Sequence, residues 1–167
     1  GAGAYQASGT FNGLTAGPYT VTVQDANLCT FNVAVTITQP AAALSGSISS
    51  QTNVACFGDA TGSVTVAGSG GTGAYQYKLG AGAYQASGTF NGLSAGPYTV
   101  TVQDANLCTF NVAVTITQPA AALSGSISSQ TNVACFGDAT GSVTIAGSGG
   151  TGAYQYKLGA GAYQASG

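Results

Sequence analysis

The chain has 167 residues and only six charged side chains, two Lys and four Asp, and it contains no His. General acid–base catalysis usually draws on His, Glu or Lys, so this inventory argues against an enzyme and against a cofactor. Two Lys cannot neutralise a run of phosphates, so no nucleic-acid partner is expected. No apolar run approaches the roughly 18 residues of a membrane-spanning helix. Without an initiator Met or a signal-peptide pattern, we expect a soluble piece of a longer protein that does not insert into a membrane.

The sequence is a tandem repeat with a long period. Tyr5 recurs as Tyr84 and Tyr163, and both intervals equal 79 residues. Residues 1–88 recur as residues 80–167 with two exceptions, Thr15 against Ser94 and Val66 against Ile145. A period of 79 exceeds the roughly 20–50 residues of solenoid units that cannot fold alone. Each repeat is therefore expected to be a small domain of its own.

Two proline-containing linkers mark the repeat boundaries. Pro40 and Pro119 each stand in the run Gln-Pro-Ala-Ala-Ala, and proline ends strand pairing because it lacks the backbone N–H. The predicted organisation is the C-terminal half of a repeat at 1–40, a complete repeat at 41–119 and the N-terminal part of the next repeat at 120–167.

Within the complete repeat, apolar and polar residues alternate in short runs separated by Gly, Asn and Asp, which is typical of antiparallel strands. In chain order, strands are expected at residues 44–48, 62–67, 75–79, 83–86, 89–90, 98–103 and 108–118. The last two form a long hairpin, in which Val100 and Val102 face inward and Thr99 and Thr101 face outward. About seven strands in under 80 residues predict an all-β fold, an Ig-like antiparallel β-sandwich.

The predicted core consists of the inward-facing apolar side chains of these strands. They are Val64, Val66, Tyr75, Tyr77, Leu79, Phe90, Leu93, Tyr98, Val100, Val102, Phe110, Val112, Val114 and Ile116.

Four motifs in this order resemble the SprB-type repeats of Bacteroidetes surface proteins. They are the Cys-Phe-Gly-Asp-Ala-Thr-Gly-Ser run from Cys56, the Gly-Gly-Thr-Gly-Ala-Tyr-Gln-Tyr run from Gly70, the run from Leu93 to Cys108, and the closing Val-Thr-Ile-Thr-Gln-Pro. The resemblance covers the whole repeat and implies a long cell-surface or gliding adhesin exported by the type IX route. Leu107 departs from the family pattern, which usually has Gly at this position of the turn.

The expected function is a passive, extracellular stalk that extends a distal binding region from the cell surface and bears tension. Neighbouring repeats of the same chain are the expected partners, and regions outside this sequence would contact surface polysaccharide or another substratum. One alternative is a self-assembling filament or sheath, in which other copies of the chain are partners, since little charge repulsion would oppose association. A polysaccharide-binding module is a second alternative.

Each repeat has two cysteines, which are Cys56 and Cys108 in the complete one. An even count in an exported protein indicates a disulfide. We expect both to lie near one end of the sandwich, which favours a Cys56–Cys108 bond worth about 4 kcal/mol, with Cys29 and Cys135 pairing with repeats outside this sequence. A Cys29–Cys56 bond across the linker and free thiols remain open. Two Cys without His cannot supply the four ligands of a zinc site.

The remaining candidates each have an ordinary structural explanation that we favour. Asp59 and Asp104 are weak calcium candidates, since calcium takes six to eight oxygens, and turn formation explains both. An isopeptide bond between Lys78 and Asn106 is considered, but the alternation around Lys78 points its side chain into solvent.

Outward threonine rows and surplus aromatic side chains are the last features of interest. The rows Thr99/Thr101 and Thr115/Thr117 raise ice or glycan binding, although exposed Thr is simply a good strand residue. Tyr84 and Phe57 could anchor a partner, but core positions are favoured for both.

Overall fold

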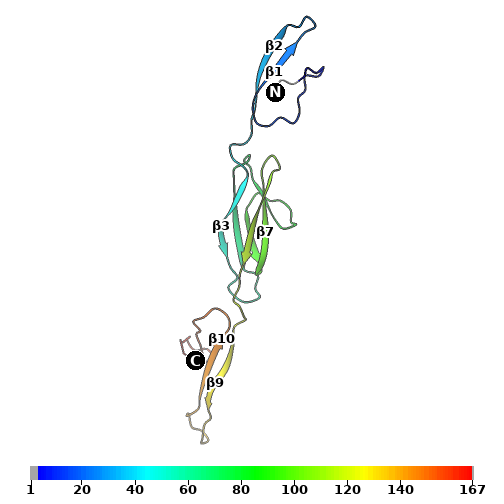
Figure 1. Ribbon diagram of the computed structural model, residues 1–167. Helices are drawn as coiled ribbons and strands as arrows, with labels where there is room; N and C mark the ends of the chain where they lie inside the picture. Colours follow the sequence, from blue (N-terminus) through cyan, green and yellow to red (C-terminus); the bar gives the residue numbers. More distant parts are fainter. Residues whose placement is uncertain (1–3, 167) are drawn as a thin grey trace. The chain divides into compact units, whose positions relative to one another are not determined.

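The computed structural model describes residues 4–166 and, within them, consists of strands joined by turns and loops. The strands are β1 Gly17–Gln24, β2 Thr30–Ile37, β3 Ser45–Thr52, β4 Gly62–Ser69, β5 Gln76–Leu79, β6 Thr89–Leu93, β7 Gly96–Gln103, β8 Thr109–Ile116, β9 Ser124–Thr131 and β10 Ser142–Ser148 (Figure 1). The chain divides into two compact units, Gly1–Ala43 and Leu44–Gly167. In the part of the chain that is described, no helix could cross a membrane.

The complete repeat is a sandwich of two three-stranded sheets. One sheet has the order β3-β4-β6 and the other β5-β7-β8, and every neighbouring pair is antiparallel. This is the division of an immunoglobulin domain into an ABE sheet and a CFG sheet, without a D strand. The predicted all-β sandwich repeat is confirmed.

The β7–β8 hairpin follows the predicted register. Gly96 pairs with Ile116 and Gln103 with Thr109, so the two eight-residue strands match along their whole length. Val100 and Val102 are fully buried, whereas Thr99 is exposed and Thr101 is half-buried. Since side chains alternate between the two faces of a strand, this pattern places the apolar face of the hairpin against the other sheet.

The hydrophobic core of the complete repeat lies between its two sheets. Its buried members are Val54, Val64, Val66, Tyr77, Leu93, Val100, Val102, Val112, Val114 and Ile116, and Leu44, Tyr75, Leu79, Phe90 and Tyr98 pack against them. Phe110 was predicted in this core and is 39% exposed, so that prediction is wrong. Phe110 lies at the start of β8, next to the turn from β7, and it faces Gly46 in the other sheet, which has no side chain to cover it.

The strand predicted at residues 83–86 is also wrong. This segment forms only an isolated bridge, in which Tyr77 and Gln85 exchange backbone hydrogen bonds of 2.8 Å. Gly88 then brings its carbonyl to the N–H of Val66 at 2.9 Å, so this stretch borders β4 without a ladder of its own. The complete repeat consequently has six strands instead of seven.

A five-residue turn connects β7 to β8. Asp104 accepts a hydrogen bond from Leu107 N–H at 3.0 Å and donates its own N–H to Cys108 O at 3.0 Å. Leu107 adopts a positive φ of 64°. A turn closed by a left-handed residue in this way is a hairpin with a bulge, a position that favours Gly.

Each of the two part-repeats keeps one hairpin of the complete repeat, which is β1–β2 in the first and β9–β10 in the second. The hairpin β1–β2 has the register of β7–β8, from Gly17 opposite Ile37 to Gln24 opposite Thr30. Val23 is 57% exposed there, whereas its counterpart Val102 is 0% exposed. The hairpin therefore forms locally, and its burial depends on the second sheet.

Candidate functional site

The complete repeat has two distinct ends, and they are the candidate functional regions. We call the end that holds Leu44, Ser69 and the turn Asp104–Cys108 the entry end, because β3 begins there opposite Ser69. We call the end that holds Thr117 and the loop of residues 53–61 the exit end, because β8 finishes there.

Asp104 organises the entry end. Its carboxylate is buried and accepts three backbone hydrogen bonds, from Asn106 N–H and Cys108 N–H at Oδ1 (3.0 and 2.9 Å) and from Thr72 N–H at Oδ2 (3.0 Å). Asn106 also donates its side-chain amide to Thr72 Oγ1 at 2.8 Å. The carboxylate therefore fastens the β7–β8 turn to the loop between β4 and β5.

These contacts change the acidity of Asp104. The hydrogen bond from Thr72 N–H is the largest cause that lowers its pKa, burial acts in the opposite direction, and the bonds from Cys108 and Asn106 lower it further. The net pKa lies below the ordinary value, because the charged form receives these donors.

At the exit end, hydrogen bonds join the region of the first strand to the last strand. Gln51 donates its side-chain amide to Thr115 O at 2.8 Å, and Val54 N–H donates to Thr117 O at 2.9 Å. Asn53 accepts the N–H of Thr117 at 3.1 Å. These bonds cross from one sheet to the other, and no sequence pattern predicts them.

The turn of the exit-end loop is fastened in the same way. Gly58 donates its N–H to Gln118 Oε1 at 2.9 Å, within a turn in which Asp59 N–H donates to Cys56 O at 3.2 Å. Gly58 has a φ of 86°, which a type II turn requires at its third residue.

The two cysteines of the complete repeat lie at opposite ends. Cys56 belongs to the exit-end turn and Cys108 to the entry-end turn, and both are exposed free thiols. Strands of eight residues separate the ends by about 25 Å, whereas disulfide-bonded residues need Cα atoms within about 7 Å. The expectation that both cysteines lie near one end is wrong, and this fold does not accommodate a Cys56–Cys108 bond within one repeat.

The calcium candidates are likewise separated. Asp59 forms part of the exit-end turn, whereas Asp104 lies at the entry end with its carboxylate oxygens bound to backbone N–H groups. Among the residues described, no three His, Cys, Asp or Glu side chains lie together as a metal site would require.

Lys78 lies half-buried on β5, with its Nζ 5.0 Å from the ring centroid of Tyr84. Asn106 bonds Thr72 instead, so the structure does not bring this lysine and asparagine together. Tyr84 is half-buried beneath the lysine, whereas Phe57 is exposed, so the core interpretation of Phe57 is wrong. Phe57 sits in the exit-end turn, outside both sheets.

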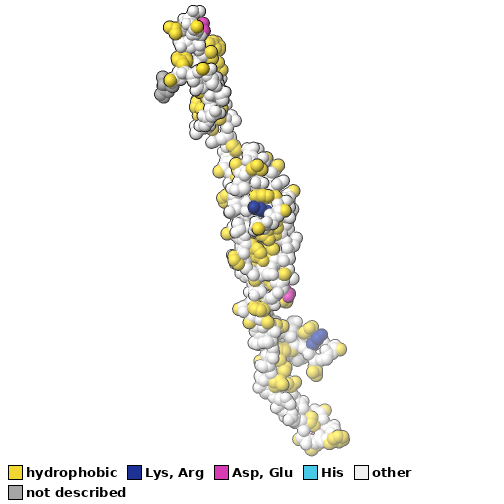
Figure 2. Space-filling model, turned by 90° about the vertical axis from the view of Figure 1, so that its right-hand side faces the viewer, with side chains coloured by type: hydrophobic (Ala, Val, Ile, Leu, Met, Phe, Trp, Pro, Cys, Tyr) yellow, Lys and Arg dark blue, Asp and Glu magenta, His cyan; other side chains and the backbone are white. Residues whose placement is uncertain are grey.

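The threonine rows form part of the ordinary sheet surface. Thr99, Thr115 and Thr117 are exposed, and Thr101 donates its hydroxyl to Asn111 Oδ1 at 2.8 Å across the hairpin. The face shown in Figure 2 carries isolated Lys and Asp side chains among apolar and neutral ones. Charge is too sparse on this face to attract a strongly charged ligand.

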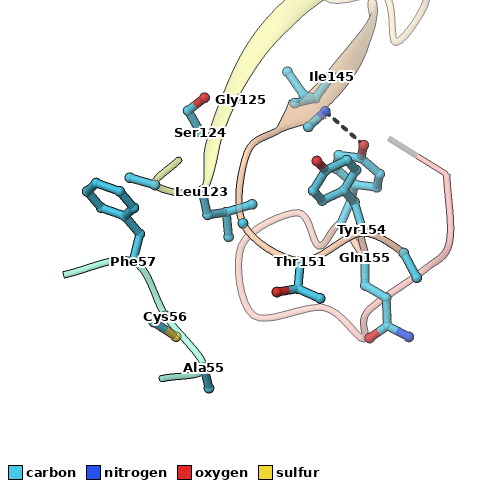
Figure 3. A pocket seen from close by; sticks show the side chains of 15 residues that line it. Ala55, Cys56, Phe57, Leu123, Ser124, Gly125, Ile145, Thr151, Tyr154 and Gln155 are labelled. Carbon is cyan, nitrogen blue, oxygen red and sulfur yellow. Dashed lines mark hydrogen bonds between the residues drawn. The ribbon is translucent and has the colours of Figure 1, made fainter. Parts of the chain in front are cut away.

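A pocket lies between the exit-end loop and the part-repeat that follows it (Figure 3). Ala55, Cys56 and Phe57 line one side, and the other side includes Leu123, Ile145, Thr151 and Tyr154. Tyr156 also lines it and accepts the N–H of Gly147 at 3.0 Å. Residues 120–167 correspond to residues 41–88, so they include no counterpart of β7 and β8.

This correspondence explains the pocket. Ile145 and Tyr156 are the counterparts of Val66 and Tyr77, which are buried in the complete repeat under β7 and β8. The apolar wall of the pocket is therefore a sandwich core face without its covering hairpin, and it is not assigned to a ligand.

Comparison with known proteins agrees with the repeat organisation. The SprB repeat family matches residues 48–83 and residues 127–162, two segments that are 79 residues apart. Each match begins in the first strand of a repeat and ends after the region of Tyr77 or its counterpart Tyr156. Neither the curated proteins nor the solved structures gave a match. Together with the two-sheet sandwich and the 79-residue period, these two matches confirm the predicted SprB-type repeat in this chain.

Proposed function

We propose that this chain is part of the stalk of a long, exported surface adhesin, in which consecutive sandwiches extend a distal binding region and bear tension. The SprB repeat supports the coarser statement, a repeat module of a cell-surface adhesin-like protein. The finer statement is supported by one structural observation, which is how the first and last strands of the complete repeat are joined.

The chain enters and leaves the repeat at opposite ends. β3 starts at the entry end, β8 finishes at the exit end, and both run in that direction. A force applied through the two linkers would pull β3 and β8 in opposite directions along their lengths.

The exit-end hydrogen bonds oppose this sliding. The bonds from Gln51 to Thr115, from Val54 to Thr117 and from Thr117 to Asn53 connect the two strand ends side by side. Because they lie across the direction of pull, they must break together and not one after another. A repeat built in this way resists tension more than its modest core would suggest.

Single-molecule force spectroscopy tests this proposal. Asn53→Ala removes the acceptor of Thr117 N–H and should lower the force at which the complete repeat unfolds. Asn111→Ala is the matched control, since Asn111 accepts a hydrogen bond only from Thr101 within the β7–β8 hairpin. An equal fall in unfolding force for both variants, or unfolding of the wild-type repeat without a force peak, would contradict a tension-bearing role.

A filament or sheath is the second candidate, favoured by the six charges in 167 residues. Low charge leaves little electrostatic repulsion between neighbouring chains. Electron microscopy separates the two candidates, because a stalk gives isolated threads whereas a sheath gives fibres of uniform thickness that grow with protein concentration.

A further inference from the structure

We propose that disulfide bonds join consecutive repeats, each between the exit-end cysteine of one repeat and the entry-end cysteine of the next. Cys56 is the exit-end cysteine of the complete repeat, and Cys108 is its entry-end cysteine. This pairing applies to a stalk and to a filament alike.

The exit-end cysteine is presented toward the linker. Cys56 starts the turn that Gly58 fastens to Gln118 at 2.9 Å, and Gln118 directly precedes the linker proline, Pro119. The thiol is exposed. Seven residues, 117–123, lie between the end of β8 and the start of β9, so the next repeat begins close to this turn.

The entry-end cysteine is fixed against one loop of its own repeat. Cys108 N–H donates to Asp104 Oδ1 at 2.9 Å, while Asp104 Oδ2 accepts the N–H of Thr72. Ala105 N–H adds a bond to Thr72 O at 3.2 Å. In a complete repeat, the entry-end cysteine and Thr72 therefore bind the same carboxylate, that of Asp104.

The pocket of Figure 3 is lined by residues from both sides of the junction between two repeats. Thr151 is the counterpart of Thr72 in the repeat that follows, and it lines the same pocket as Cys56. In the complete form of that repeat, the turn of its second hairpin binds Thr151 as the Asp104 turn binds Thr72. The cysteine of that turn then lies at the same end of its repeat as Thr151, the end that meets Cys56 across the linker.

The cysteines in the sequence shown belong to different junctions. Cys56 faces the junction that follows the complete repeat, and Cys108 faces the one that precedes it. By the same positions in their repeats, Cys29 is an entry-end cysteine and Cys135 an exit-end cysteine. The partner of Cys56 is therefore the copy of Cys108 one period beyond it.

The bond forms by thiol–disulfide exchange with a small disulfide oxidant such as oxidised glutathione. Two cysteine thiols lose two protons and two electrons and form one S–S bond, and the oxidant is reduced to two thiols. The product holds the two ends covalently across the linker, so that tension on the linker is shared by a second connection.

The test extends the full chain so that two consecutive repeats are complete. Residues 1–167 are followed directly by a second copy of residues 89–119, which continues the repeat without a break, and Cys29→Ser removes the unpaired entry-end thiol. After equilibration in a glutathione redox buffer, free thiols are alkylated and the unfolded protein is cut with trypsin after Lys78 and Lys157. The expected product links the peptide of residues 1–78 to the C-terminal peptide, while Cys108 and Cys135 are recovered alkylated.

Two variants serve as controls. Cys56→Ser should abolish the linked product, whereas Cys135→Ser should leave it unchanged, and circular dichroism should show the same β fold for both because these thiols are exposed. A link from Cys56 to the peptide of residues 79–157 would overturn the proposal, and so would recovery of Cys56 as an alkylated thiol in the folded protein.

Discussion

Gly88 is a residue at which the neighbouring backbone leaves no room for a side chain. Its carbonyl accepts the N–H of Val66 at 2.9 Å, and a Cβ at this position would overlap the carbonyl oxygen of Val66. We expect Gly88→Ala to destabilise the complete repeat by about 3 kcal/mol, as measured by urea denaturation.

The sequence supplies its own control for this prediction. Gly9 is the counterpart of Gly88 in the first part-repeat, and a Cβ there would meet nothing within 4 Å. Gly9→Ala should change the free energy of unfolding by less than about 0.5 kcal/mol. Equal effects of the two substitutions would show that backbone propensity, and not the contact with Val66, is responsible.

Leu107 occupies a position that suits glycine. Its φ is 64°, and its side chain is 73% exposed, so it gains little from packing. Leu107→Gly should stabilise the complete repeat by about 0.5–1 kcal/mol, because the cost of a left-handed leucine exceeds the extra chain entropy of glycine. A lower urea midpoint for this variant would contradict the assigned turn.

The lowered pKa of Asp104 makes the stability of the complete repeat depend on pH. Its folded-state pKa lies below the ordinary value, so the stabilisation is complete above about pH 4 and is lost as the pH falls through the folded pKa. Thermal unfolding should therefore show a falling midpoint under acid conditions, and Asp104→Asn should lower the midpoint at pH 7 and flatten its acid dependence. An unchanged acid dependence in the variant would assign the effect to another group.

The sequence predicts the orientation of strand residues better than it predicts the hydrogen bonds of loop residues. Alternation was sufficient to place Val100 inward and Thr99 outward, because the period of a strand is fixed by its geometry. The role of Asn53 at the exit end could not be predicted, since its partner Thr117 is 64 residues away and no periodicity connects them.

At the scale of elements, local sequence forms a hairpin and the second sheet buries it. The strands β1–β2 and β7–β8 share one sequence and one register, yet only the second hairpin has a buried face. Hairpin formation could thus be predicted from short-range pattern, whereas burial depends on residues far along the chain.

The same principle gives a test on β9 and β10. Val143 is 48% exposed on β10, whereas its counterpart Val64 is 1% exposed in the complete repeat. Adding residues 89–119 after residue 167 should cover this face and slow amide hydrogen exchange in both strands. Exchange in β1 and β2 should stay the same, because that part-repeat gains no partner; slower exchange in both regions would indicate a general effect of chain length.

The placement of the cysteines shows where element-level prediction fails. The end of the sandwich at which a residue lies depends on how often the chain reverses before it. β5 and β6 both run toward the exit end, because the segment between them returns without forming a ladder. A count of strand-like runs does not reveal this return, so the sequence did not establish that Cys56 and Cys108 lie apart.

For the whole molecule, each repeat should unfold as an independent unit. The complete repeat closes its core with its own residues, and the period is 79 residues. Stretching a chain of several repeats with their cysteines reduced should give force peaks of similar height, each releasing about 20–25 nm of chain. Steps twice as long would show that neighbouring repeats unfold together.

The contact between β3 and β8 has a consequence for how such a chain is made. The first strand of a repeat cannot complete its contacts until the last strand of that repeat has been synthesised or has emerged during export. Until then the apolar side chains of its sheet, such as Val64 and Val66 on β4, are open to any hairpin of the same sequence, and neighbouring repeats are nearly identical. Sequence alone cannot distinguish the correct hairpin from that of a neighbour, so the order of emergence must supply the fidelity: the hairpin that arrives first is the one that belongs to the same repeat.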